Sequence, residues 1–179
     1  MLKNIIHLAI SITAFSLAYS IAFLTEIDLV KSAILYAFVI QWVLFVPAYL
    51  LKTEKFYDLS GSLTYIFVVS YVSYNYYLID GINFGNIIIG LAIIFWAVRL
   101  GSFLFLRIHK AGEDRRFNEI KTSATRFFMT WTLQGMWVSI CSACALTAIS
   151  SSKGVQINYL LFIGLAIFLI GFFIEVIAD

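Results

Sequence analysis

Two arginines and two carboxylates occupy positions where a mostly apolar sequence makes ionised side chains costly. Arg99 lies inside the apolar run 87–106, and Arg107 follows eight residues later, roughly 80° further around a helix. A guanidinium inside a membrane costs roughly 2.5–3.5 kcal/mol on insertion scales. We therefore expect Arg99 to face a partner, a cavity or a bound anion. The structural alternative is that its side chain snorkels or pairs with a neighbouring helix.

The carboxylates Glu175 and Asp179 are four residues apart at the end of the apolar run 159–177. Like charges at this spacing share one helix face and repel by a few tenths of a kcal/mol. The two arginines, water or ligand hydroxyl groups must offset that repulsion. Carboxylates commonly accept hydrogen bonds from the ribose of a nucleotide. Alternatively, Asp179 is a frayed end in water.

Gln134 is a polar side chain within the apolar run 127–149. Its structural role would be interhelical hydrogen bonding, and its functional role a substrate contact. The nearby Cys141 and Cys144 have no metal-binding or redox spacing and are predicted to be packing residues. The sequence contains no glycine-rich dinucleotide fingerprint, no nucleophile elbow and no metal-spaced cluster. No metal site is predicted.

Long apolar segments must position these residues. The chain has 179 residues, of which 62% are hydrophobic and 12% charged, whereas soluble domains have about 45–50% and about 25%. Continuous runs of membrane length indicate helices, because backbone polar groups in lipid must be satisfied within the segment. We predict one all-α transmembrane domain, residues 1–179, with about six spans near 5–24, 29–51, 63–79, 87–106, 127–149 and 159–177.

The basic residues predict how this bundle is oriented. With six spans, the N-terminus, the second and fourth loops and the C-terminus share one face. That face carries nine of the lysines and arginines, whereas the opposite face has only Lys31 and Lys153. The bias of Lys and Arg toward short cytoplasmic loops places both termini in the cytosol. We expect a multi-pass protein of a bacterial inner membrane.

Five stretches of the chain form a recognisable series. They are FYDLSGSLTY (56–65), WAVRLG (96–101) continuing to Leu106 and Arg107, DRRF (114–117), LQGMW (133–137) and the closing EVIAD (175–179). These stretches resemble the steroid 5-alpha-reductase-like membrane family, in particular its bacterial branch known as domain of unknown function 1295, and they span most of the chain in the expected order.

The resemblance implies a helical bundle that binds NADPH from the cytosol and reduces a carbon–carbon double bond in a steroid- or lipid-like enone. By position, Glu175 and Asp179 match the pair near the adenosine and ribose, and Arg99 and Arg107 match basic positions of the cofactor pocket. Gln134 and either Tyr57 or Asp58 would lie toward the substrate. No catalytic residue is assigned.

One departure from the family affects the expected activity. Members usually continue for another seventy or more residues, through a C-terminal half that supplies many of the contacts with the cofactor. The resemblance therefore implies the N-terminal part of an NADPH-dependent oxidoreductase acting on CH–CH groups, incomplete alone, with a second polypeptide supplying the rest. The alternative is a noncatalytic membrane module that packs against a partner or binds lipid, for which Gly164, Ala166 and Gly171 would allow close helix approach.

Overall fold

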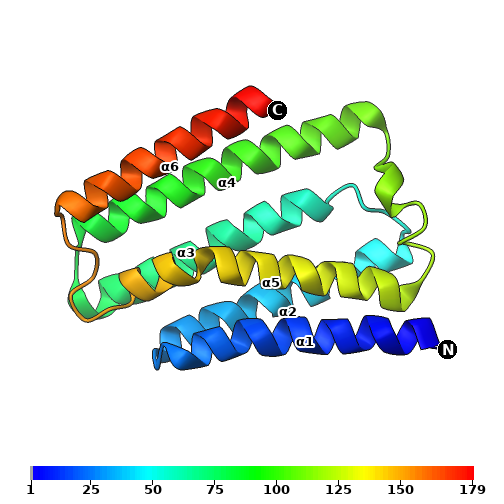
Figure 1. Cartoon of the computed structure of the whole chain (residues 1–179), viewed down its shortest axis with the longest axis horizontal. Helices are drawn as coiled ribbons and strands as arrows, with labels where there is room; N and C mark the ends of the chain where they lie inside the picture. The colour runs from blue at the N-terminus through cyan, green and yellow to red at the C-terminus, as the bar shows by residue number, and fades with distance from the viewer. Residues whose placement is uncertain (1) are drawn as a thin grey trace.

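Six long α-helices and one short 3-10 helix make up residues 2–179, the part of the chain that this computed structural model describes (Figure 1). No strand occurs among these residues, so the predicted all-helical bundle is confirmed. The elements are α1 (Leu2–Leu24), α2 (Asp28–Leu50), α3 (Tyr57–Asp80), α4 (Phe84–Ala111), η1 (Arg115–Phe117), α5 (Ala124–Ile149) and α6 (Tyr159–Ala178).

Polar caps and glycines set the ends of the later helices. The Asn83 side chain accepts a hydrogen bond from the Asn86 backbone N–H at the start of α4, at 2.9 Å. Asn158 accepts two such bonds at the start of α6. These oxygens satisfy backbone donors that have no partner within the helix. Gly112 follows α4 with φ +83°, a conformation that glycine adopts without strain.

Five of the helices are long and apolar enough to cross a membrane: α1, α2, α4, α5 and α6. The exception is α3, which is of similar length but contains serine, threonine, asparagine and tyrosine side chains. It also begins at Tyr57, six residues before the predicted run 63–79. Ser60 and Ser62 in this extension are buried, because they face other helices of the bundle. The architecture is that of an integral, multi-pass membrane protein.

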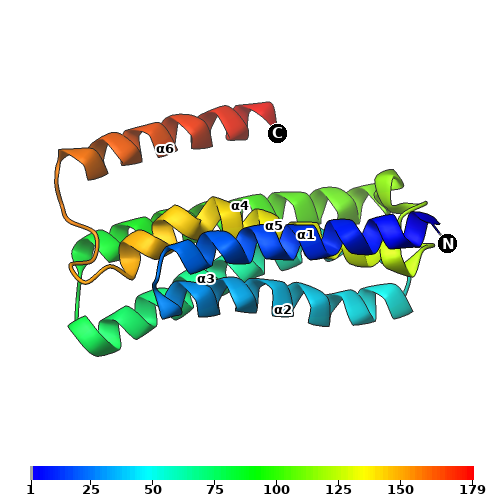
Figure 2. The ribbon, with the colours of Figure 1, turned by 60° about the horizontal axis from the view of Figure 1, so that its bottom comes forward.

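The helices α1 to α5 pack closely, whereas α6 stands apart from them. The core includes the fully buried Phe38, Phe127 and Trp131. In Figures 1 and 2, α6 lies alongside α4 and away from α1 and α2. Leu161 is the buried residue of α6. Side chains connect α6 to α4, among them Phe95 and Phe172, whose ring centroids are 5.3 Å apart.

The end of the bundle that holds the N-terminus of α1 also holds the loop between α2 and α3 and the loop between α4 and α5 (Figure 1). Glu54 ties these two loops together. Its buried carboxylate accepts hydrogen bonds from Lys121 Nζ at 2.8 Å and from the Asp114 backbone N–H at 3.1 Å. The basic residues gather in these segments, so this is the end of the bundle that the bias of Lys and Arg predicts to be cytosolic.

Candidate functional site

A cluster of ion pairs joins α4 to α6. Arg99 Nη1 lies 2.7 Å from Glu175 Oε1, and Arg99 Nη2 lies 2.6 Å from Asp179 Oδ2. The three side chains are 20 to 32% exposed. The guanidinium therefore lies between the two carboxylates and offsets their mutual repulsion. Arg99 was expected to face a partner, a cavity or an anion, and the structure shows carboxylate partners from α6. Three of the four residues expected near a cofactor therefore lie together.

The fourth residue, Arg107, lies two turns further along α4 and is connected to the cluster through Phe103. The Arg107 guanidinium lies 5.5 Å from the centroid of the Phe103 ring, and that of Arg99 lies 5.4 Å from the same ring. Arg107 is exposed and forms no ion pair with a carboxylate within residues 2–179. Its positive charge remains available to an anionic ligand.

Trp96 connects the ion-pair cluster to a cavity between α3, α4 and α5. Its Nε1 donates a hydrogen bond to Glu175 Oε2 at 2.9 Å. Its ring packs edge-on against Tyr65, with the centroids 5.1 Å apart. The cavity has a volume of about 150 Å³, and its lining includes Asp58, Ser62, Tyr65, Trp96 and Gln134. The cluster and the cavity therefore share one side chain.

The cavity contains two polar groups without a protein partner. The Asp58 carboxylate and the Ser62 hydroxyl form no hydrogen bond or ion pair with any other residue of the described chain. Asp58 is the second residue of α3, where the positive end of the helix dipole favours a carboxylate. Ser62 can donate to a carbonyl oxygen, and Asp58 can accept from a hydroxyl group.

The cavity wall depends on the side chain of Gln134. Gln134 Nε2 donates to the Tyr57 carbonyl oxygen at 2.6 Å and to Ser60 Oγ at 3.2 Å. A Cβ on Gly61 would lie 2.6 Å from the same nitrogen, so only glycine leaves room for it. Ser60 is also bonded to Gln41, a fully buried residue of α2. Gln134 therefore joins α5 to α3 as well as lining the cavity.

Tyr57 does not line the cavity, unlike Asp58 and Gln134, the other two residues expected near a substrate. Its hydroxyl donates to the Thr130 carbonyl oxygen at 3.0 Å. Its ring packs against Phe117 and Trp131, with centroid distances of 5.0 and 5.2 Å. Asp58 and Gln134 line the cavity, but Tyr57 is not among the lining residues. Of the two alternatives left open by the sequence, Asp58 is the one that borders the cavity.

The two cysteines are exposed, and their prediction as packing residues was wrong. Both line a larger groove of about 690 Å³ between α4, α5 and α6, together with Gly164 and Leu165. The groove exists because α6 stands away from α5. A Cβ on Gly164 or Gly171 would meet no atom within 4 Å, so these small residues do not mediate close helix contact within the described chain.

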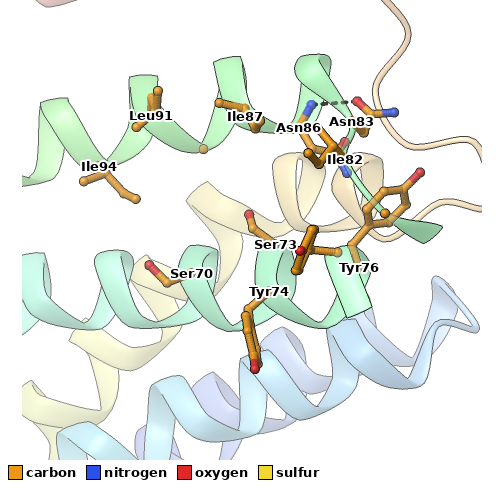
Figure 3. A pocket seen from close by; sticks show the side chains of 13 residues that line it. Ser70, Ser73, Tyr74, Tyr76, Ile82, Asn83, Asn86, Ile87, Leu91 and Ile94 are labelled. Atoms are coloured by element: carbon orange, nitrogen blue, oxygen red, sulfur yellow. Dashed lines mark hydrogen bonds between the residues drawn. The ribbon is translucent and has the colours of Figure 1, made fainter. Parts of the chain in front are cut away.

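A further hollow of about 330 Å³ lies at the opposite end of the bundle, between α3 and α4. Figure 3 shows Ser70 and Ser73 of α3 on one side and Ile87 and Leu91 of α4 on the other. Asn86, at the start of α4, donates to the Ile149 carbonyl oxygen and accepts from the Val155 backbone N–H. This amide therefore fixes the connection between α5 and α6. No charged residue lines the hollow.

Charged groups stabilise the loop between α2 and α3 and the loop between α4 and α5. Burial raises the pKa of Glu54, but the bonds from Lys121 and the Asp114 backbone lower it by more, so this pKa lies below its ordinary value of 4.5. The hydrogen bond from Arg116 lowers the pKa of Asp114 below 3.8. The same pairing raises the pKa of Arg116. These groups remain ionised at neutral pH.

Sequence reasoning missed Trp96, Ser62 and Phe103. A signal existed for Trp96 and Phe103, because they lie three residues before and four residues after Arg99, on the same face of a helix. Ser62 gave no such signal, since it lies in a polar segment just before the predicted run 63–79. Its role depends on α3 beginning at Tyr57.

The comparisons with known proteins give one positive result. The model of a family described as "Protein of unknown function (DUF1295)" matches residues 44–179. This range covers the cavity, the ion-pair cluster and Arg107. No curated protein and no solved structure matches the chain.

Proposed function

Because the chain belongs to the DUF1295 family, we propose that it is the membrane part of an NADPH-dependent reductase that acts on carbon–carbon double bonds in steroid- or lipid-like enones. The observation that carries the proposal is the sharing of Trp96. This side chain lines the cavity that contains Asp58 and Gln134, and it donates to the Glu175 carboxylate of the ion-pair cluster. The residues expected near a substrate and those expected near a cofactor are therefore adjacent.

The residues along α4 and α6 fit part of a dinucleotide. The oxygens of Glu175 and Asp179 suit ribose hydroxyl groups, and the unpaired Arg107 suits a phosphate. Arg99 is already paired with two carboxylates, so it orients them and has little charge left for a phosphate. The proposal therefore assigns the remaining phosphate contacts to a second polypeptide. Bound NADPH would supply a hydride donor.

The cavity fits one end of a lipid-like substrate. Its volume of about 150 Å³ is below the roughly 300–1,000 Å³ of pockets that enclose a drug-sized ligand. An enone ring would enter between α4 and α5, because α3 packs directly against α4 at Gly101, and its apolar remainder would extend into the bilayer. The Ser62 hydroxyl would donate to the carbonyl oxygen, and Trp96 and Leu100 would exclude water from the double bond.

The proposal is tested by measuring enone reduction in membranes from the native host, which also contain any second polypeptide. We expect loss of an α,β-unsaturated steroid ketone together with one equivalent of NADPH. Glu175→Gln removes the charge that holds Arg99 and Trp96. Because hydrogen bonds to charged groups contribute about 1.5–3 kcal/mol, we expect the rate to fall about tenfold or more.

Glu113→Gln is the matched control, because Glu113 is an exposed carboxylate on the same face of the membrane, outside the cluster. It should leave the rate unchanged. If membranes containing the folded wild-type chain reduce no enone above the level of host membranes lacking it, the proposed activity is wrong. If Glu175→Gln and Glu113→Gln behave alike, the site is wrong.

The second candidate function is a noncatalytic module that packs against a partner protein or binds lipid. The groove between α4, α5 and α6 favours this function. It is lined by Gly164 and both cysteines, among others, and none of the described residues fills it, so a partner helix or a lipid chain has room there. Labelling of Cys144 by N-ethylmaleimide tests this function. Slower labelling in native membranes than in purified protein would support a partner. Equal labelling, together with only monomer after cross-linking, would contradict it.

A further inference from the structure

A polar hollow lies at the cytosolic end of the bundle, remote from the cavity that Trp96 borders. It has a volume of about 530 Å³ and lies where α1 and α5 begin. Every residue that lines it is polar or charged, including the basic Lys3, His7 and Arg126 and one carboxylate, Glu119. Figures 1 and 2 both show the first turns of α1 beside the loop that leads into α5. The hollow thus collects basic groups from two elements that are far apart in sequence.

Hydrogen bonds hold the two walls of the hollow together. His7 Nδ1 lies 3.2 Å from Thr125 Oγ1. The Thr125 hydroxyl donates to Asn4 Oδ1 at 3.1 Å. Lys3 and His7 are four residues apart and therefore lie on the same face of α1. These contacts hold the turn of α1 that carries Lys3 and His7 beside the start of α5.

The hollow has an excess of positive charge. Lys3 has no carboxylate partner within residues 2–179. Arg126 lies 3.5 Å from Glu119, but these side chains are 40% and 88% exposed, and such exposed pairs are worth little. The positive end of the α5 dipole is directed toward the same place. An anionic group is therefore favoured here.

An apolar groove lies further along the same two helices, and it begins at Ile6, next to His7 in the sequence. It has a volume of about 400 Å³ and lies between α1 and α5, lined by Ile6, Ile10 and Leu17 of α1 and by Leu133 and Met136 of α5. Ile6, Ile10 and Leu17 lie on the same face of α1 as Lys3, because their spacings are close to whole turns of the helix. The basic residues of the hollow and the apolar residues of the groove therefore follow one another along the same face of α1.

We infer that the hollow and the groove together bind one anionic phospholipid of the cytoplasmic leaflet. Its phosphate lies between Lys3 and Arg126, and one acyl chain follows Ile6 and Ile10 along the groove. Basic pockets between transmembrane helices on the cytoplasmic side are suited to anionic headgroups. A free phosphate would use the hollow but would leave the groove without an occupant.

Native mass spectrometry of the detergent-solubilised chain, titrated with phosphatidylglycerol or phosphatidylcholine, tests this inference. We expect phosphatidylglycerol to bind more tightly. Since a Lys or Arg near an anionic membrane contributes about 1 kcal/mol, Lys3→Gln and Arg126→Gln should each weaken its binding about fivefold. Thr13→Phe fills the groove and should weaken binding of the lipid while leaving any binding of glycerol 3-phosphate unchanged.

Lys55→Gln is the matched control, because Lys55 is an exposed basic residue on the same membrane face but outside the hollow. It should leave phosphatidylglycerol binding unchanged. Three outcomes would overturn the inference: equal affinity for the two lipids, equal effects of Lys3→Gln and Lys55→Gln, or complete competition by inorganic phosphate with no effect of Thr13→Phe. Circular dichroism verifies that each variant is folded.

Discussion

The Arg99 guanidinium pairs with two carboxylates at the end of α6, so it stabilises the chain both by attracting them and by offsetting their mutual repulsion. The side chains are partly exposed, so the attraction is weaker than in a dry interior. Removing the arginine nevertheless leaves Glu175 and Asp179 without a cation and close to each other. The indole of Trp96 bonds to the same Glu175, so a change at Arg99 also affects the cavity.

Arg99→Gln is therefore expected to destabilise the chain. Breaking a fully buried pair costs about 3–5 kcal/mol, whereas exposed pairs contribute about 0–1 kcal/mol. For this intermediate exposure we expect a loss of about 1–2 kcal/mol in the free energy of unfolding. Denaturant unfolding in mixed micelles measures it. The double variant Arg99→Gln, Glu175→Gln should recover part of the loss, and additive effects in the two single variants would contradict the pairing.

Glu54 gives a pH dependence whose sign follows from its lowered pKa. A carboxylate that is more acidic when folded contributes its full stability above its ordinary pKa of 4.5 and loses it as the pH falls through the folded-state value. We expect the melting temperature to fall below about pH 4.5, with Asp114 adding to the fall at still lower pH. Glu54→Gln should flatten this decline and lower the melting temperature at neutral pH. An identical pH profile in variant and wild type would contradict the contact with Lys121.

At the scale of the helices, apolar run length predicts five of the six spans, and the polar residues explain the exception. The run 63–79 gave only part of α3, since hydropathy cannot distinguish a polar loop from polar residues that face other helices. Ser60 and Ser62 are such residues, and they contribute to the Gln134 network and to the cavity. The meeting of Arg99 with Glu175 was predictable from charge and position. The separation of α6 from α5 was not, because it depends on tertiary packing.

The contact between α3 and α4 depends on Gly101. A Cβ at this position would lie 2.6 Å from both the Cβ and the Oγ of Ser62, so the helices would have to move apart. Overpacking of this kind costs about 1–3 kcal/mol, and we expect Gly101→Ala to lower the melting temperature and enlarge the cavity. The matched control is Gly164→Ala, where a Cβ meets open space. A Gly101→Ala variant as stable as Gly164→Ala would contradict the close approach of α3 and α4.

At the scale of the whole molecule, Arg107, the ion-pair cluster and Trp96, which lines the cavity, form one continuous strip. It runs along α4 from the exposed Arg107 through Phe103 and Arg99 to Trp96. Its basic end, Arg107, lies toward the end of the bundle that is predicted to be cytosolic, and its other end, Trp96, lies within the bundle and lines the cavity. The proposed reductase would use both ends of this strip, because a soluble nucleotide and a membrane-embedded substrate would arrive from different phases.

Photo-crosslinking with an azido derivative of NADPH in native membranes tests whether the strip along α4 binds the cofactor. Labelled peptides are then identified by mass spectrometry. We expect the label to attach to peptides from α4 and α6, unlabelled NADPH to compete with it, and Arg107→Gln to reduce it. If the label attaches nowhere on the folded chain, or attaches equally in the presence of excess NADPH, the strip along α4 is not a cofactor site.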